Sequence, residues 1–226
     1  MSNCSSGFAI RAKAGLGKKI YRPGYDIALP SYSHWHHKLP SASSSPSAAE
    51  KTWLLSMPQH SRAVAYPSLL QEVERLSENN PGLVRLMSDG TSSSQQVYIL
   101  ITHFLIQPVV LRTLFVFSLL KHDLMASSTF CLVLDARSDA GRVLMDVLRL
   151  GCIPVVADDS AVMPFSEVLD WKRFSIRVYQ KDVSSVLDMV MDVNAARVKE
   201  MQSQVTITFN QVFFGILPLT PSPILP

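Results

Sequence analysis

The spacing of apolar and polar residues is regular in the second half of the chain, between residues 122 and 205. Residues 129–134 and 153–156 are continuous apolar runs, which are typical of strands covered on both faces of a parallel sheet. Between them, residues 142–150 carry apolar side chains at helical spacing, and Gly151 follows as a helix stop. A strand, a helix and a second strand in this order predict a βαβ unit with a right-handed crossover.

Weaker patterns extend the same organisation on both sides. Residues 53–55 favour a short strand, and Pro67 occupies the first turn of a helix that ends near Asn79. Residues 174–178 favour another strand, and Asn194 is a suitable N-cap for a following helix. We therefore predict the α/β class, with a doubly wound parallel sheet that is Rossmann-like.

Three segments lack such a pattern, and two of them are polar or broken by proline. Residues 31–50 are rich in serine, proline and histidine and predict a flexible surface loop. Its histidines (His34, His36 and His37) have no carboxylate or thiolate partners on rigid elements, so a solvated loop is favoured over a metal site. Residues 206–226 form an apolar, proline-punctuated tail, which we expect to pack poorly.

The third segment, residues 97–121, is dominated by apolar and aromatic residues and is long enough to span a bilayer. It contains Arg112, and an arginine at the centre of a span costs about 2.5–3.5 kcal/mol on insertion scales. A partly buried segment is therefore favoured over a transmembrane helix.

Composition and charge narrow the function classes. Of the 226 residues, 47% are apolar, which supplies a sizeable core and excludes an intrinsically disordered protein. The net charge is only +3, too small for the basic face that non-specific nucleic-acid binding needs. Residues 1–20 carry no signal peptide, so either the protein is cytosolic or the start of a longer protein is absent.

Two motifs then resemble a known family. Residues 151–156 (GCIPVV) and 164–171 (PFSEVLDW) closely resemble the exostosin domain, the glycosyltransferase family 47 module, in their order and spacing. Residues 130–134 (FCLVL) fit the same pattern, and residues 25–32 (YDIALPSY) are similar to an upstream element of the family. The confident match runs from about residue 122 to residue 205, and roughly half of the chain is covered in all.

This resemblance implies an architecture and an activity. Residues 1–90 would be a remnant of the N-terminal half of an exostosin domain, and residues 122–205 the nucleotide-sugar-binding half of a glycosyltransferase-B fold. The implied reaction transfers sugar from a UDP-sugar to a glycosaminoglycan acceptor in heparan sulfate synthesis, with no metal cofactor. The implied place is the lumenal side of Golgi or endoplasmic reticulum membranes, with another exostosin as a possible hetero-oligomeric partner. Residues 97–121 and 206–226 have no counterpart in the family's pattern.

Candidate donor-binding residues follow from the sheet and from the resemblance. Ligands of doubly wound sheets bind beyond the carboxyl ends of the strands, where residues 135–141 are expected to lie. Arg137 and Arg142 could contact the donor there, and the resemblance gives Glu167 the role of accepting hydrogen bonds from ribose hydroxyls. The alternative is that residues 164–171 form a packing corner with Glu167 solvated. No catalytic residue and no metal-ligand set is recognisable.

The sequence also departs from the family's pattern at this site. Asp135 and Ala136 stand where relatives commonly carry Arg-Gly, and Ala161 stands where an aromatic residue is expected. The carboxylate reverses the charge expected beside a donor diphosphate, so we expect impaired transfer. The alternative is a non-catalytic structural subunit that holds an active exostosin partner.

The resemblance finally implies a disulfide between Cys131 and Cys152. An oxidising compartment such as the Golgi lumen permits such a bridge. Two buried free thiols are the alternative.

Overall fold

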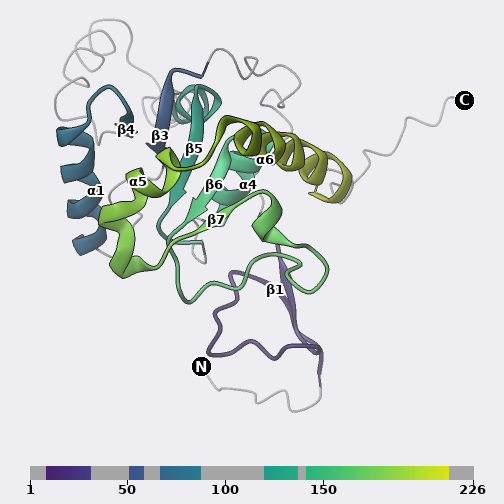
Figure 1. Ribbon diagram of the computed structural model, residues 1–226. Coiled ribbons are helices and arrows are strands. Elements are labelled where there is room, and N and C mark those ends of the chain that lie inside the picture. The colour runs from purple at the N-terminus through teal and green to yellow at the C-terminus, as the bar shows by residue number, and fades with distance from the viewer. Residues whose placement is uncertain (1–8, 32–50, 59–66, 88–119, 137–140, 214–226) are drawn as a thin grey trace, which may run out of the picture.

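The computed structural model describes residues 9–31, 51–58, 67–87, 120–136 and 141–213 (Figure 1). The predictions for the histidine-rich loop, for Arg137, for most of residues 97–121 and for the end of the tail lie outside these residues. Within the described ranges, no helix is both long enough and apolar enough to cross a membrane.

Five parallel strands form the central sheet of the molecule. Their order across the sheet is β4-β3-β5-β6-β7, and every neighbouring pair is parallel. The strands are β3 (Trp53–Met57), β4 (Val84–Leu86), β5 (Ser128–Val133), β6 (Ile153–Val156) and β7 (Ile176–Arg177). The predicted parallel α/β class is confirmed, and the sheet extends further towards the N-terminus than residues 122–205 because β3 pairs with β5.

The strand order contains a point at which the chain reverses its direction across the sheet. The first strand of the sheet, β3, has the second strand, β4, on one side and the third strand, β5, on the other. From β5 onwards, each new strand is added on the same side. In open α/β sheets, ligands bind at the carboxyl ends of the strands next to such a switch point. We therefore expect a ligand site among the loops that follow β3, β5 and β6.

Helices cover the sheet and connect its strands. They are α1 (Pro67–Asn79), α4 (Gly141–Arg149), α5 (Val186–Met191) and α6 (Ala195–Thr208), with an additional helix over residues 120–126. Proline is well suited to the first turn of α1, because that position has no intrahelical partner for an N–H group. The predicted N-cap of α6 is also present, since Asn194 Oδ1 accepts a 2.8 Å hydrogen bond from the backbone N–H of Arg197.

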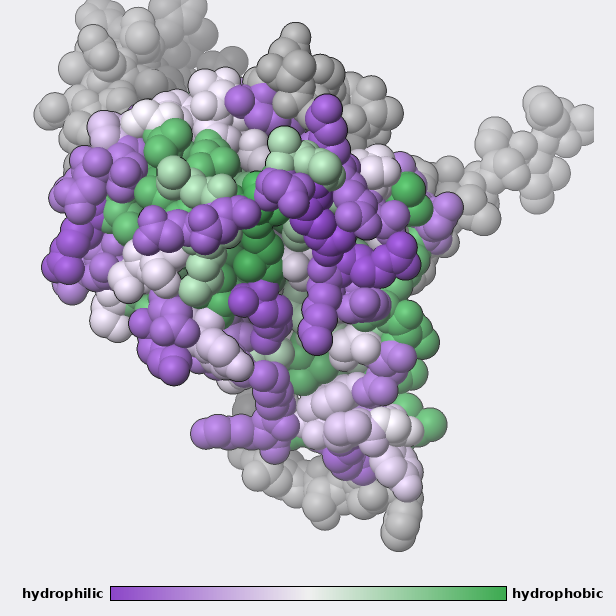
Figure 2. Space-filling view, viewed as in Figure 1, coloured by the Kyte–Doolittle hydropathy of each residue, from purple (hydrophilic) through white to green (hydrophobic). Residues whose placement is uncertain are grey.

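Strand β5 lies at the centre of the core and buries both of its faces. Phe130 and Leu132 pack in a large cluster with residues of β3, β6, α5 and α6. Cys131 and Val133 point to the other side, into a smaller cluster with Val143, Val147 and Cys152. This alternation explains why the strand is apolar throughout its length. On the face shown in Figure 2, hydrophilic residues surround a patch of hydrophobic residues.

The prediction of a poorly packed tail is wrong for residues 206–213. Helix α6 runs to Thr208 and continues as a π-helical turn over Phe209–Phe213. Phe213 is fully buried, and its ring centroid lies 5.9 Å from that of Phe165 and 6.2 Å from that of Trp171. Apolar side chains four residues apart share one face of a helix, and this spacing continues beyond Val205 to Phe209 and Phe213. The core therefore includes Phe209 and Phe213.

A small N-terminal unit, residues 9–31, lies beside the carboxyl edge of the sheet (Figure 1). It contains a parallel pair of short strands, β1 (Ala12–Ala14) and β2 (Ile27–Leu29). Asp26, only 1% exposed, holds the unit together because it forms ion pairs of 2.7 Å with both Arg11 and Arg22.

Candidate functional site

The loops after β5 and β6 are tied together by a buried carboxylate. Asp158, two residues beyond β6, is fully buried. Its Oδ2 accepts a 3.2 Å hydrogen bond from the backbone N–H of Ala136, which lies beyond β5. Its Oδ1 accepts from the backbone N–H and the hydroxyl of Ser160, at 3.0 and 2.7 Å. Asp158 thus fixes the carboxyl edge of the sheet at the position where a ligand is expected.

A cation also reaches this edge from the neighbouring strand. Arg177 ends β7, and its Nη2 donates to the backbone oxygens of Asp158 at 3.0 Å and Ala161 at 3.5 Å. Burial lowers the pKa of Arg177, and the negative charges of Asp158 and Asp159 oppose that shift. Sequence analysis missed this residue, although an arginine at the carboxyl end of a strand was a usable signal.

The turn that carries Glu167 is rigidly built. Phe165 has a positive φ of 53°, a left-handed backbone conformation that residues other than glycine rarely adopt. Its backbone N–H donates to the carbonyl of Ala28 at 2.8 Å, and the indole N–H of Trp171 donates to the carbonyl of Pro164 at 2.9 Å. Trp171 is buried while Glu167 is exposed. The segment is therefore a packing corner. It also presents a carboxylate at the carboxyl edge of the sheet, which we call the rim.

The N-terminal unit joins this rim through backbone hydrogen bonds. Lys18 N–H donates to the carbonyl of Ser160 at 2.8 Å, and Val162 N–H donates to the carbonyl of Leu16 at 3.0 Å. The hydroxyl of Tyr21 donates a hydrogen bond to Oε1 of Glu167. Burial, and then the hydrogen bond and charge of Glu167, raise the pKa of Tyr21. Sequence analysis did not find this contact, because nothing local links residues so far apart in the chain.

The sequence-predicted donor residues have different positions in the structure. Glu167 lies on the rim, as described. Arg142 is exposed in the first turn of α4, which begins just after the loop that follows β5. In the part of the chain that the structure describes, Glu167 pairs with Tyr21 and not with Arg142. Asp135, one of the departures from the family's pattern, is buried at 3% exposure beside this loop.

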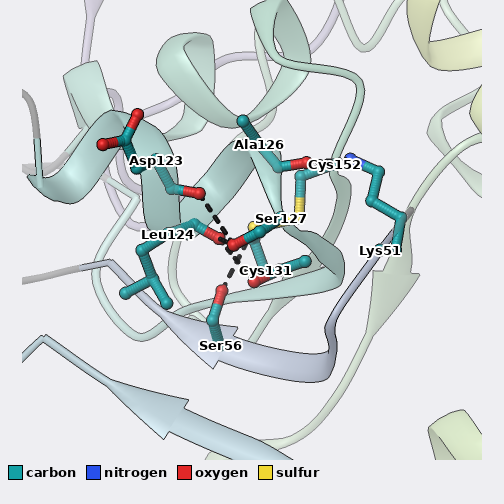
Figure 3. Close-up of a disulfide and its surroundings, with 9 residues drawn as sticks. Lys51, Ser56, Asp123, Leu124, Ala126, Ser127, Cys131 and Cys152 are labelled. Carbon is teal, nitrogen blue, oxygen red and sulfur yellow. Dashed lines mark hydrogen bonds between the residues drawn. A yellow bond between two sulfur atoms is a disulfide. The ribbon is translucent and has the colours of Figure 1, made fainter. Parts of the chain in front are cut away.

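A disulfide links two neighbouring parts of the sheet (Figure 3). It joins Cys131 in β5 to Cys152 just before β6, with a Cα–Cα distance of 5.9 Å, and it is the pair that the resemblance implied. The hydroxyl of Ser56 in β3 lies 3.6 Å from Sγ of Cys131. Close by, Lys51 Nζ donates to the carbonyl of Ala126 at 2.6 Å, and burial lowers the pKa of Lys51 to about 8. These groups connect β3, β5 and the residues before β6.

A metal centre is not apparent among the residues that the structure describes. In those ranges, no group of three or more histidine, cysteine, aspartate or glutamate side chains is placed to hold a metal ion.

Comparison with known proteins gives the family of the chain. The exostosin GT47 domain matches residues 3–193. Exostosin-2 of Bos taurus and of Homo sapiens are each 30% identical over 197 residues, which is 87% of this chain and 25% of the relative. The exostosin-1 homolog of Caenorhabditis elegans is 41% identical over 80 residues, which is 35% of this chain and 21% of the relative. The chain thus spans about a quarter of the length of the exostosin-2 relatives.

Solved structures add little to this result. The structure of TarM has a TM-score of 0.44 and 8% sequence identity, and the match covers 81% of this chain and 35% of that one. A similarity at this level carries no argument about the site. The family is shown by two other results, the domain match over residues 3–193 and the 30% identity to exostosin-2 over 87% of the chain. The chain belongs to the exostosin GT47 family.

Proposed function

We propose that this chain binds a UDP-sugar at the carboxyl edge of its sheet, as the nucleotide-sugar-binding half of an exostosin-type glycosyltransferase with impaired transfer. The observation that carries the proposal is the carboxylate of Glu167. It is exposed at the rim of a parallel sheet, on a turn fixed by Trp171 and by the N-terminal unit. A carboxylate in that position can accept hydrogen bonds from both hydroxyls of a ribose.

The phosphates of the donor need positive charge or N–H groups. Helix α4 begins after the loop that follows β5, and the first N–H groups of a helix have no intrahelical partner, so we propose that they bind the phosphates. Arg142 in its first turn and Arg177 at the end of β7 supply guanidinium groups on either side of β6. Asp135, buried two residues beyond β5, adds a negative charge after this strand, which supports the proposal that transfer is impaired.

The acceptor and the compartment are proposed from the family. The relatives are exostosins, so a glycosaminoglycan acceptor of the heparan sulfate type is the substrate that we propose. The Cys131–Cys152 disulfide favours an oxidising compartment, which supports the lumen of the Golgi or the endoplasmic reticulum.

A second candidate is a structural subunit that assembles with an active exostosin. One observation favours it: Asp135 places a carboxylate where the family's pattern has an arginine, which reverses the charge expected at the donor site. Such a subunit would bind its partner without binding UDP, so the two candidates predict different results in the same titration.

The decisive experiment is a calorimetric titration of the chain with UDP. We expect binding by the unmodified chain and a loss of affinity of about tenfold or more in Glu167→Ala, the effect of removing a charged hydrogen-bond partner. Glu78→Ala is the matched control, because it removes an exposed carboxylate from α1. Absence of UDP binding by the unmodified chain would contradict the proposal and would favour the structural subunit.

A further inference from the structure

The contact between Tyr21 and Glu167 joins two parts of the chain that are 146 residues apart. Glu167 is the carboxylate on which the proposed donor site rests, and its partner comes from the N-terminal unit, outside the central sheet. The inference below rests on that proposed function and assigns a residue to it that the sequence motifs do not include.

The position of Tyr21 is fixed from several directions. Backbone hydrogen bonds join Lys18 to Ser160, and the backbone N–H groups of Ile20 and Tyr21 donate to the carbonyl of Gly17 at 3.0 and 3.1 Å. The following residue, Arg22, is held by the buried carboxylate of Asp26. The backbone of Tyr21 therefore lies between a bridge to residues 160–162 and an ion-pair cluster, which holds its Cα near Glu167.

The chemistry of the contact leaves half of the carboxylate available. The phenol donates to Oε1 only, and an ionised carboxylate offers about four lone-pair sites on its two oxygens. Glu167 is exposed, so a ligand can approach its side chain, and the hydrogen bond from Tyr21 occupies Oε1 and not Oε2. An exposed glutamate without a partner would sample several rotamers, and binding would then lose the free energy of restricting them.

We propose that Tyr21 is a positioning residue for the donor ribose. Its hydroxyl holds Glu167 by Oε1 in the orientation in which Oε2 accepts hydrogen bonds from the two ribose hydroxyls. The N-terminal unit thereby becomes part of the nucleotide site, although it contributes no strand to the main sheet. A phenol is protonated at neutral pH, as a donor must be, and burial, then the hydrogen bond and charge of Glu167, raise the pKa of Tyr21 further.

The test compares two ligands that differ only at the ribose, UDP and 2′,3′-dideoxyuridine diphosphate. In Tyr21→Phe, which keeps the ring and removes the hydroxyl, we expect the affinity for UDP to fall about tenfold and the affinity for the dideoxy ligand to stay unchanged. In the Glu167→Ala background, Tyr21→Phe should have no further effect, because the group it positions is absent. Thermal melting of each variant verifies that it is folded.

Tyr25→Phe is the matched control, because it removes a hydroxyl from the same N-terminal unit. The ring of Tyr25 contacts Arg22, with 5.9 Å between Cζ of Arg22 and the ring centroid. An equal loss of affinity for both ligands in Tyr21→Phe would make the role merely structural and overturn the proposal. Unchanged or tighter UDP binding would also overturn it, and tighter binding would show that the phenol competes with the ribose. If the unmodified chain bound no UDP, the proposed function itself would fail together with this inference.

Discussion

At the residue scale, one buried carboxylate organises the N-terminal unit. Asp26 accepts hydrogen bonds from the side chains of Arg11 and Arg22 and from the backbone N–H groups of both. These contacts come from residues on both sides of β1, so the ion pairs close the unit where an apolar core is too small to do so. Tyr21, next to Arg22, depends on this closure for its position at the rim.

The pH dependence of stability should report this cluster. Arg22 and then Arg11 hold the pKa of Asp26 far below its usual range, whereas in the unfolded chain it returns to about 3.9. The folded-state pKa is depressed, so the stabilisation is fully present above pH 4 or so and is lost as the pH falls towards the folded-state pKa. We expect Asp26→Asn to melt several degrees below the unmodified chain at pH 6. The difference between the two melting temperatures should narrow as the pH falls from about 4 towards 2.

Thermal melts monitored by circular dichroism at several pH values measure this difference. Glu72→Gln is the control, because Glu72 pairs with Arg75 on the surface of α1, and such exposed pairs contribute little. A constant difference between Asp26→Asn and the unmodified chain from pH 6 to pH 2 would argue against a role for the ionised carboxylate.

At the scale of elements, α6 and its π-helical extension show how a helix can be longer than its apparent pattern. Met201, Val205, Phe209 and Phe213 are all buried and lie four residues apart. The stripe is easily missed in the sequence, since Ile207 and Val212 add apolar residues on other faces and blur the helical period. The packing partners of Phe213 are Phe165 and Trp171, so this stripe also supports the turn that carries Glu167.

Truncation of the Phe213 side chain should therefore be costly. We expect Phe213→Ala to lower the free energy of unfolding by about 3–5 kcal/mol, because it removes a fully buried aromatic side chain and leaves a cavity. Urea unfolding followed by fluorescence measures the change. Gln211→Ala, an exposed position in the same turn, should change it by less than about 0.5 kcal/mol. Similar stabilities for the two variants would mean that residues 209–213 do not pack as described.

The disulfide connects two neighbouring elements, β5 and the segment between α4 and β6. Its residues are separated by 21 positions, and closing a loop of that length should stabilise the folded state by about 3 kcal/mol on the chain-entropy estimate. We expect non-reduced protein to show no alkylation of Cys131 or Cys152 by mass spectrometry, and the double alanine variant to lose about that free energy in urea unfolding. Cys4→Ala is the control for the third cysteine. Alkylation of both cysteines without reductant would mean that they are free thiols.

The sequence predicts those elements whose contacts are local in the chain. β5, α4 and β6 follow one another directly, and each carries the period of its own structure, so the βαβ unit can be predicted. β1 cannot, because Ala12, Lys13 and Ala14 have low strand propensity and become a strand only by pairing with β2. The same holds for the site: Glu167 lies in a recognisable motif, while Tyr21 and Arg177 take their roles from distant backbone contacts.

At the scale of the whole molecule, the described residues form one α/β sheet with a small unit at its carboxyl edge. Binding of a nucleotide needs only such an edge. Transfer of sugar needs more, because the acceptor must be held against the donor and water must be excluded from the reacting bond. In a glycosyltransferase-B architecture this is the task of a second domain that faces the first across a cleft.

We therefore expect UDP binding without sugar transfer. The leaving UDP develops negative charge in the transition state, and Asp135 places a carboxylate near the edge where that charge would form. Loss of one electrostatic contact of this kind typically lowers the rate by about two to three orders of magnitude, even before the acceptor side is considered. The measurement is incubation of the chain with UDP-glucuronic acid, UDP-N-acetylglucosamine and a heparosan acceptor, followed by mass spectrometry of the acceptor. Elongation that disappears in Glu167→Ala would contradict this prediction, since it would show that the edge of this sheet supports transfer despite Asp135.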